Sequence, residues 1–314
     1  MSIDATFVST NASGIHQDVV VIFGVSSSDV PVNVTAVVTV PSIFASSPST
    51  NWSGYQFCND SGGYTCSGTP STVANGAFMN FTQPNVYDPT GTGAPSCDNT
   101  IGCSTDIWTG LDTACQGVGG YILQTGSVGY IRNPSGLLEV TNYWLWWEDV
   151  ESSSSTATTC MGTLGGNLIS PGDTIDEGVY VSASNSGEYY VYSIDANNEN
   201  GCSPTNPYTF SHTPYYEDFI TERETAGTSL TAIAKFDTTT VSGQVEWGTS
   251  TYPISRPWGD GWYSQILMEN GSPQVTNVCS GSWSGSSCTN SVSGGIGVGT
   301  FGSFTNTWLT SSGT

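Results

Sequence analysis

Apolar and polar residues alternate over many short stretches of this 314-residue chain, and Gly, Asn, Ser and Pro separate the stretches. Short runs rich in Val, Ile and Tyr between turn-forming residues predict β-strands. No helix start followed by a 3.6-residue apolar period is evident. The expected strands are residues 19–25, 32–40, 76–82, 119–125, 143–147, 179–183, 188–194, 219–222 and 230–236. The pattern therefore predicts an all-β fold, an antiparallel β-sandwich of two packed sheets.

Composition divides the chain into three parts. Residues 1–50 are strand-rich and end in the Ser/Pro segment Ala45–Thr50, which is typical of a linker or boundary. Residues 51–290 carry most of the expected strands and form the main domain. Residues 291–314 are rich in Gly, Ser and Thr and predict either a final strand or a loosely ordered extension.

Permanent positive charge is nearly absent, since Arg132, Arg223, Lys235 and Arg256 stand against 26 carboxylates in a net charge of -22. At about pH 2 most carboxylates are protonated, so little positive charge remains to drive acid unfolding. An acidic surface that keeps the protein soluble is the alternative, but charged residues make up only 10% of the chain. The charge predicts a protein suited to acid, and it argues against nucleic acid and anionic membrane partners.

The nine cysteines indicate an oxidising compartment. Three close pairs, Cys58/Cys66, Cys97/Cys103 and Cys279/Cys288, lie in polar loops and predict short-range disulfides. The pairing of the remaining Cys115, Cys160 and Cys202 stays open. No pair of CxxC motifs predicts zinc, and we expect neither metal nor cofactor.

Location and assembly follow from the same features. The chain has no run of about 20 apolar residues, so we expect no membrane insertion. Sequons that fit a secreted glycoprotein occur at Asn11, Asn33, Asn51, Asn59, Asn80 and Asn270, although chance supplies some in so polar a chain. We expect an extracellular monomer.

Two familiar hydrolase sites are missing from the sequence. His16 and His212 are the only histidines and no GxSxG motif accompanies them, which disfavours a Ser–His–Asp site. An aspartic dyad needs two Asp-Thr/Ser-Gly triplets, but only Asp60-Ser61-Gly62 occurs, inside the Cys58/Cys66 loop. A peptidase of either class is therefore not expected.

Five motifs follow one another in order along residues 51–290. They are Asn-Trp-Ser-Gly-Tyr at 51–55, Trp-Thr-Gly-Leu-Asp at 108–112, Tyr-Ile-Leu-Gln-Thr-Gly at 121–126, Ile-Ser-Pro-Gly-Asp-Thr-Ile at 169–175 and Asp-Phe-Ile-Thr-Glu at 218–222. In this order and spacing the chain resembles the glutamic peptidases (eqolisins, peptidase family G1). The resemblance implies a lectin-like sandwich of two curved sheets and a secreted acid endopeptidase.

The resemblance implies that Gln124 and Glu222 are the catalytic pair. Glu222 would take a proton from the attacking water and return it to the leaving amine. Gln124 would donate a hydrogen bond to the oxyanion, with an amide that keeps its donor at any working pH. The residues expected to line the cleft and bind substrate are Trp108, Asp112, Trp144, Trp146 and Asp218, whereas Asp173 is expected to be structural.

Strand geometry adds a separate expectation. Alternate residues of a strand share a face, so Asp218, Glu222 and Glu224 should point one way, into a wet cleft. Neighbouring acids share protons, which raises some of their pKa values.

The chain departs from the family pattern at three places. The family's Trp-Tyr-Glu-Trp-Tyr becomes Trp-Leu-Trp-Trp-Glu at 144–148, so Trp146 replaces a glutamate in the cleft. Glu217-Asp218 replaces Ala-Glu, and Ser127-Val128 replaces the aromatic-Asp pair after Gln-Thr-Gly. These changes leave the expected catalytic pair intact and bear on substrate preference and pH optimum.

We therefore expect an acid endopeptidase that cleaves unfolded polypeptides at about pH 2–4, where a glutamate is partly ionised. The alternative is a non-catalytic carbohydrate-binding or cell-surface β-sandwich protein. Cleavage of a denatured protein would discriminate between them.

Overall fold

The computed structural model describes the backbone of most of the chain. The described residues are 5–12, 15–25, 31–38, 44–58, 72–89, 97, 102–115, 120–132, 140–151, 154–162, 167–182, 185–226, 229–247, 250–253, 262–270, 275–285, 287–289, 293–294 and 302–310. The expected Cys58/Cys66 disulfide and the Asp60-Ser61-Gly62 turn fall outside them. Strands dominate the described residues and no α-helix occurs among them, which confirms the all-β prediction.

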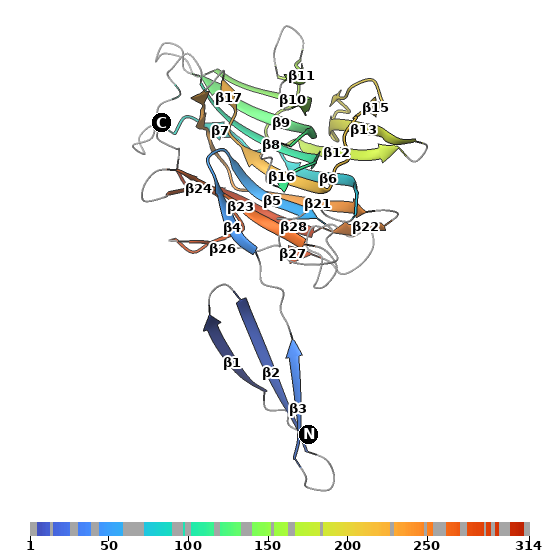
Figure 1. Cartoon of the computed structure of the whole chain (residues 1–314). Coiled ribbons are helices and arrows are strands. Elements are labelled where there is room, and N and C mark those ends of the chain that lie inside the picture. Colours follow the sequence, from blue (N-terminus) through green and yellow to red (C-terminus); the bar gives the residue numbers. More distant parts are fainter. Residues whose placement is uncertain are drawn as a thin grey trace.

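Two curved layers of mostly antiparallel strands form the body (Figure 1). The first layer runs in the order β11 (Ser154–Cys160), β10 (Val140–Glu151), β9 (Ile122–Arg132), β8 (Cys103–Asp112), β16 (Tyr216–Glu222), β5 (Trp52–Cys58) and β23 (Trp262–Asn270). The second runs β13 (Asn185–Asp195), β12 (Thr174–Ser182), β6 (Ala74–Thr82), β21 (Thr239–Trp247) and β28 (Gly302–Trp308). Strand β24 (Val275–Ser280) pairs with both β23 and β28 and so links the layers.

Shorter strands complete the fold. They are β4 (Phe44–Ser49), β7 (Val86–Tyr87), β14 (Gly201–Cys202), β15 (Tyr208–Thr209), β17 (Thr225–Ala226), β18 (Ser229–Leu230), β19 (Ala232–Ile233), β20 (Lys235–Phe236), β22 (Ser250–Pro253), β25 (Ser282–Trp283), β26 (Cys288–Thr289) and β27 (Ser293–Gly294). A separate three-stranded sheet is formed by β1 (Ala5–Ala12), β2 (Ile15–Val25) and β3 (Pro31–Val38).

Two sequence predictions of local structure were wrong. The segment Ala45–Thr50, expected as a linker, lies largely in β4, which pairs in parallel with β23. The single strand expected at 230–236 is instead three two-residue strands, of which β19 pairs with β8 and β20 with β7. In the C-terminal extension β28 pairs with β21, and the division of the chain into three parts stays a prediction.

Side-chain alternation gives the first layer two different faces. Odd-numbered residues such as Ile107, Leu123 and Phe219 point inward and join the core between the layers. Even-numbered residues such as Trp108 and Ile220 point outward, into a smaller apolar cluster. The candidate site lies over this outer apolar cluster.

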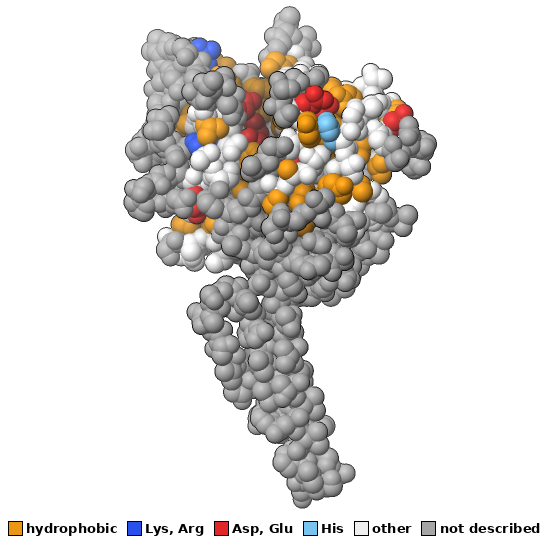
Figure 2. Space-filling model, viewed as in Figure 1, with side chains coloured by type: hydrophobic (Ala, Val, Ile, Leu, Met, Phe, Trp, Pro, Cys, Tyr) orange, Lys and Arg blue, Asp and Glu red, His pale blue; other side chains and the backbone are white. Residues whose placement is uncertain are grey.

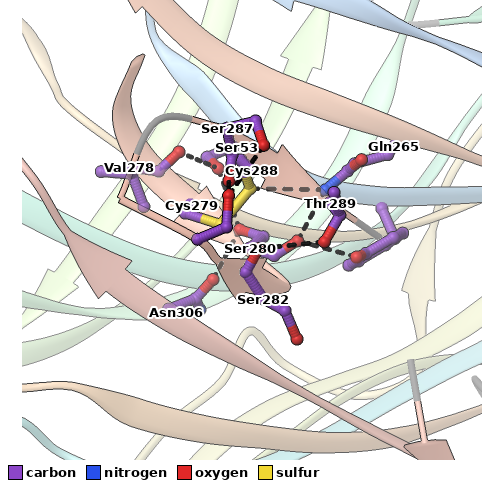
Figure 3. The surroundings of a disulfide bond; sticks show 12 residues. Ser53, Gln265, Val278, Cys279, Ser280, Ser282, Ser287, Cys288, Thr289 and Asn306 are labelled. Atoms are coloured by element: carbon purple, nitrogen blue, oxygen red, sulfur yellow. Dashed lines mark hydrogen bonds between the residues drawn. A yellow bond between two sulfur atoms is a disulfide. The ribbon is translucent and has the colours of Figure 1, made fainter. Parts of the chain in front are cut away.

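Three disulfides among the described residues link segments of the sandwich. The expected bonds Cys97–Cys103 and Cys279–Cys288 are present, and a third joins Cys160 to Cys202, two of the cysteines whose pairing was open. Figure 3 shows the surroundings of Cys279–Cys288, where Gln265 donates to the Ser280 carbonyl at 2.8 Å. Among the described residues there is no helix long and apolar enough to cross a membrane.

Candidate active site

Indole rings cover the middle of the outer face of the first layer. Trp52 of β5 meets Trp108 of β8 edge to face, with ring centroids 5.2 Å apart. Trp146 of β10 packs against the same cluster. Gly126 of β9 makes room for both rings, because a Cβ there would lie 2.7 Å from Trp108 Cβ and 2.8 Å from Trp146 Cζ2. The two predicted cleft residues Trp108 and Trp146 are thus brought together.

Glu222 is the last residue of β16. Its carboxyl accepts hydrogen bonds from Asn51, which precedes β5, and from Trp108 of β8. Asn51 Nδ2 donates to Glu222 Oε1 at 2.8 Å, and Trp108 Nε1 donates to Glu222 Oε2 at 2.8 Å. Although part of the side chain reaches the surface, its carboxyl lies among indole rings. Desolvation raises the pKa of Glu222 to about 7, against the opposing hydrogen bonds from Trp52, Trp108 and Asn51, and the charge of Glu148 adds to the rise.

This pKa changes the expected working range. The sequence predicted a glutamate partly ionised at pH 2–4, whereas Glu222 in this setting is half ionised near pH 7. The reason is desolvation of the carboxyl by burial, which the sequence motif alone does not reveal.

Gln124 of β9 points to the same outer face as Glu222, but the two are not level in the sheet. Gln124 lies in the row of Gly110 on β8 and Asp218 on β16, whereas Glu222 lies in the row of Asp106 on β8 and Val128 on β9. Its Nε2 donates to Glu148 Oε2 of β10 at 3.0 Å. Its Oε1 is buried and has no hydrogen-bond partner among the described residues. One N–H of the Gln124 amide is therefore bound to Glu148, and its oxygen accepts no hydrogen bond from the described residues.

Other carboxyls interact with Glu222 on this face. Figure 2 shows Asp and Glu side chains in separate small patches on one face of the body. Asp106 of β8 lies directly opposite Glu222 in register. Burial raises the pKa of Asp106 well above its usual range, and the charges of Glu224, Glu222 and Glu148 raise it further. Burial likewise raises the pKa of Glu224, with Glu148 adding to it.

The three remaining predicted cleft residues have other surroundings. Asp112 and Asp218 are fully buried, and Gln56 Nε2 donates to Asp218 Oδ1 at 2.8 Å. Asp218 does share the outward face, but it is not in a wet cleft, and burial followed by the charge of Asp112 raises its pKa well above the usual range. Trp144 lies further along β10, where its ring packs against Tyr130.

The other predicted residues have structural contacts. Asp173 Oδ2 accepts from the Ser170 backbone N–H at 2.7 Å, as a turn aspartate does. The ring of His212 stacks on Tyr121 with centroids 3.6 Å apart. Within the described part of the chain no group of three His, Cys, Asp or Glu side chains is placed to hold a metal ion.

Sequence reasoning missed three residues that contact or face the pair: Asn51, Asp106 and Glu148. Asn51 stood in the first motif without a role, and the other two lay outside any matched motif position. The carboxylate that Trp146 displaced is found two residues later on the same face, at Glu148. Counting alternate residues along the strand could have located it.

Comparison with known proteins gives a family. The model of the peptidase A4 family matches residues 50–290. The chain is also similar to a solved structure of scytalido-glutamic peptidase with a peptide-based transition state analog, at 14% identity over 83% of this chain and 98% of that one, with a TM-score of 0.44. It is similar to SCP-B, a member of the eqolisin family in complex with the tripeptide Ala-Ile-His, at 13% identity, 83% and 98% coverage and a TM-score of 0.43. No curated protein sequence matched the chain.

Proposed function

Because the chain belongs to the peptidase A4 family, we propose that it hydrolyses peptide bonds with Glu222 and Gln124 as its catalytic pair. Family membership confirms the expected glutamic peptidase at the level of enzyme class. The observation that carries the proposed roles is the Glu222 carboxyl, which is oriented by the N–H groups of Asn51 and Trp108 and has a pKa raised to about 7. A base with a pKa near neutrality transfers protons efficiently.

In the proposed reaction, ionised Glu222 accepts a proton from water as the water oxygen bonds to the substrate carbonyl carbon. The carbonyl oxygen becomes an oxyanion, and the second N–H of Gln124 Nε2 donates to it, since the first is bound to Glu148. The carbon–nitrogen bond then breaks, and Glu222 returns its proton to the leaving amine. A carboxylic acid and an amine are released, and Glu222 is ionised again.

The tryptophan rings of the outer apolar cluster support a polypeptide as the substrate. Trp52 and Trp146 are only partly buried and present apolar surface above the fully buried Trp108. The exposed parts of these rings can pack against side chains of an extended peptide. The three disulfides support secretion, and the acidic composition supports an acidic medium.

The function is tested by incubating the purified protein with a denatured protein from pH 2 to 7 and analysing the fragments by mass spectrometry. Wild type should release peptides at a rate that rises as Glu222 ionises toward pH 7. The double variant Gln124→Ala/Glu222→Gln, prepared identically, should release none, which excludes a contaminating protease. No cleavage by folded wild type at any pH would favour the non-catalytic β-sandwich alternative.

A further inference from the structure

Glu148 stands beside Gln124 at a position where the family pattern has a tyrosine. The two residues are direct partners in the antiparallel register of β10 and β9, so both side chains rise from the outer face at adjacent points. Their contact is the 3.0 Å hydrogen bond from Gln124 Nε2 to Glu148 Oε2.

The surroundings of Gln124 offer its amide little other support. On the β8 side its register partner is Gly110, where a Cβ would lie 3.0 Å from Gln124 Cβ. Along β9 the neighbours on the same face are Gly126 and the apolar Ile122. Glu148 is the one polar side chain directly beside Gln124, and the next carboxyls on this face are Asp112, diagonal to it on β8, and Asp218, beyond Gly110 on β16.

From these contacts we propose that Glu148 is a positioning residue that fixes which end of the Gln124 amide faces the reacting carbonyl. The inference rests on the proposed function of Gln124. An ionised carboxylate only accepts hydrogen bonds, so it holds the NH₂ end of the amide toward itself. Without that acceptor the amide is free to rotate by about 180° and to place Oε1, which has no partner here, where a donor is needed.

An acceptor turned toward a developing oxyanion repels it, so loss of Glu148 should lower the rate of the chemical step more than it weakens substrate binding. The negative charge of Glu148 has a second, separable effect. The groups that it faces across the site are Asp106 and Glu222 and, beyond β16, Glu224, and its charge raises the pKa of each.

Two variants separate these effects. Glu148→Gln keeps a carbonyl oxygen that can accept from Gln124 but removes the charge, whereas Glu148→Leu removes both. Glu151→Gln is the matched control, because Glu151 is exposed at the end of the same strand. For each enzyme, kcat and KM are measured across pH on a quenched peptide spanning a bond that wild type cleaves, and Tm reports folding.

The expected result for Glu148→Leu is a fall in kcat of roughly 10- to 100-fold with KM within about 3-fold, a part of the loss seen when an oxyanion donor is removed. Glu148→Gln should keep kcat within about 3-fold and move the acid limb of kcat/KM to lower pH, since the pKa of Glu222 falls. Glu151→Gln should match wild type.

A kcat for Glu148→Leu within about 2-fold of wild type would overturn the positioning role, as would equal losses in the Leu and Gln variants. These outcomes require an active wild type and leave the proposed function standing. An inactive wild type would overturn the proposed function itself and this inference with it.

Discussion

Two N–H donors converge on the carboxyl of Glu222, and each comes from a different part of the chain. The amide of Asn51 is itself oriented, because Ser49 Oγ donates to Asn51 Oδ1 at 3.1 Å and so turns the NH₂ end toward Glu222. The indole of Trp108 is a donor only, so it stabilises the ionised form of the carboxyl. Removing either donor should make Glu222 harder to ionise.

Trp108→Phe tests this at the level of one bond. The variant keeps a ring in the cluster but loses the donor to Glu222 Oε2, so the pKa of Glu222 should rise above about 7. We expect the acid limb of kcat/KM to move upward and activity at a fixed acidic pH to fall by roughly 3- to 10-fold. Trp283→Phe, at an exposed tryptophan elsewhere, should leave the pH profile unchanged.

At the scale of elements, the site depends on how close three strands approach one another. Gly126 lies between Trp108 of β8 and Trp146 of β10, and any side chain on it would displace one of the rings. The sequence located Trp108 and Trp146 through motifs and strand parity. It could not show that a glycine between them lets the rings meet, because that depends on register across β8, β9 and β10.

Gly126→Ala should therefore disturb the cleft without breaking a strand. The new Cβ would lie 2.8 Å from the Ile107 backbone oxygen, which cannot move aside as a side-chain tip can. We expect kcat/KM to fall by roughly 10-fold or more and Tm to drop by several degrees, from overpacking that costs about 1–3 kcal/mol. Gly201→Ala is the control, because its nearest neighbour, the Ser193 oxygen, is 3.4 Å away, and it should behave as wild type.

The presence of a strand was easier to predict from the sequence than the residues at which it begins and ends. The alternation of Val and Tyr located most of β13 but only the C-terminal part of β12, which begins at Thr174. The single strand predicted at 230–236 was wrong because the apolar run Ala232-Ile233-Ala234 resembles one strand, whereas the segment is divided among β18, β19 and β20, which pair with β17, β8 and β7. Pairing partners distant in sequence decided where each strand ends.

Across the whole molecule, buried acids set how stability responds to pH. Glu177 and Glu217 are fully buried in the core, and desolvation raises the pKa of each well above its usual range. A carboxyl with a raised pKa holds more protons in the folded than in the unfolded chain. Stability is therefore greatest below about pH 4 and falls as pH rises from the unfolded pKa toward the folded one.

We expect Tm to fall between pH 4 and pH 7 by roughly 5–15 °C, because each kcal/mol shifts Tm by about 2–4 °C in a chain of this size. Glu177→Gln removes one titrating acid and can keep the contact with Ser193, so its Tm should depend less on pH. Glu199→Gln, in an exposed turn, is the matched control. A Tm that rises from pH 4 to pH 7 would contradict the assignment of these acids.

Stability and catalytic activity are expected to depend on pH in opposite ways. Acid favours the fold, as the scarcity of Lys and Arg had predicted, whereas base catalysis needs Glu222 ionised. With a pKa of about 7 for Glu222, only about 1% of it is ionised at pH 5. Composition indicated the first constraint, but the second arises from burial of one carboxyl among indole rings.

The central claim is that Glu222 moves the proton in peptide hydrolysis. Its most direct test is kcat/KM of Glu222→Gln relative to wild type on one quenched peptide at the wild-type optimum, with equal Tm values confirming that both are folded. Since Gln is nearly isosteric and cannot take up the proton, we predict a fall of at least about 1,000-fold. A folded Glu222→Gln variant within about 10-fold of wild type would contradict the account.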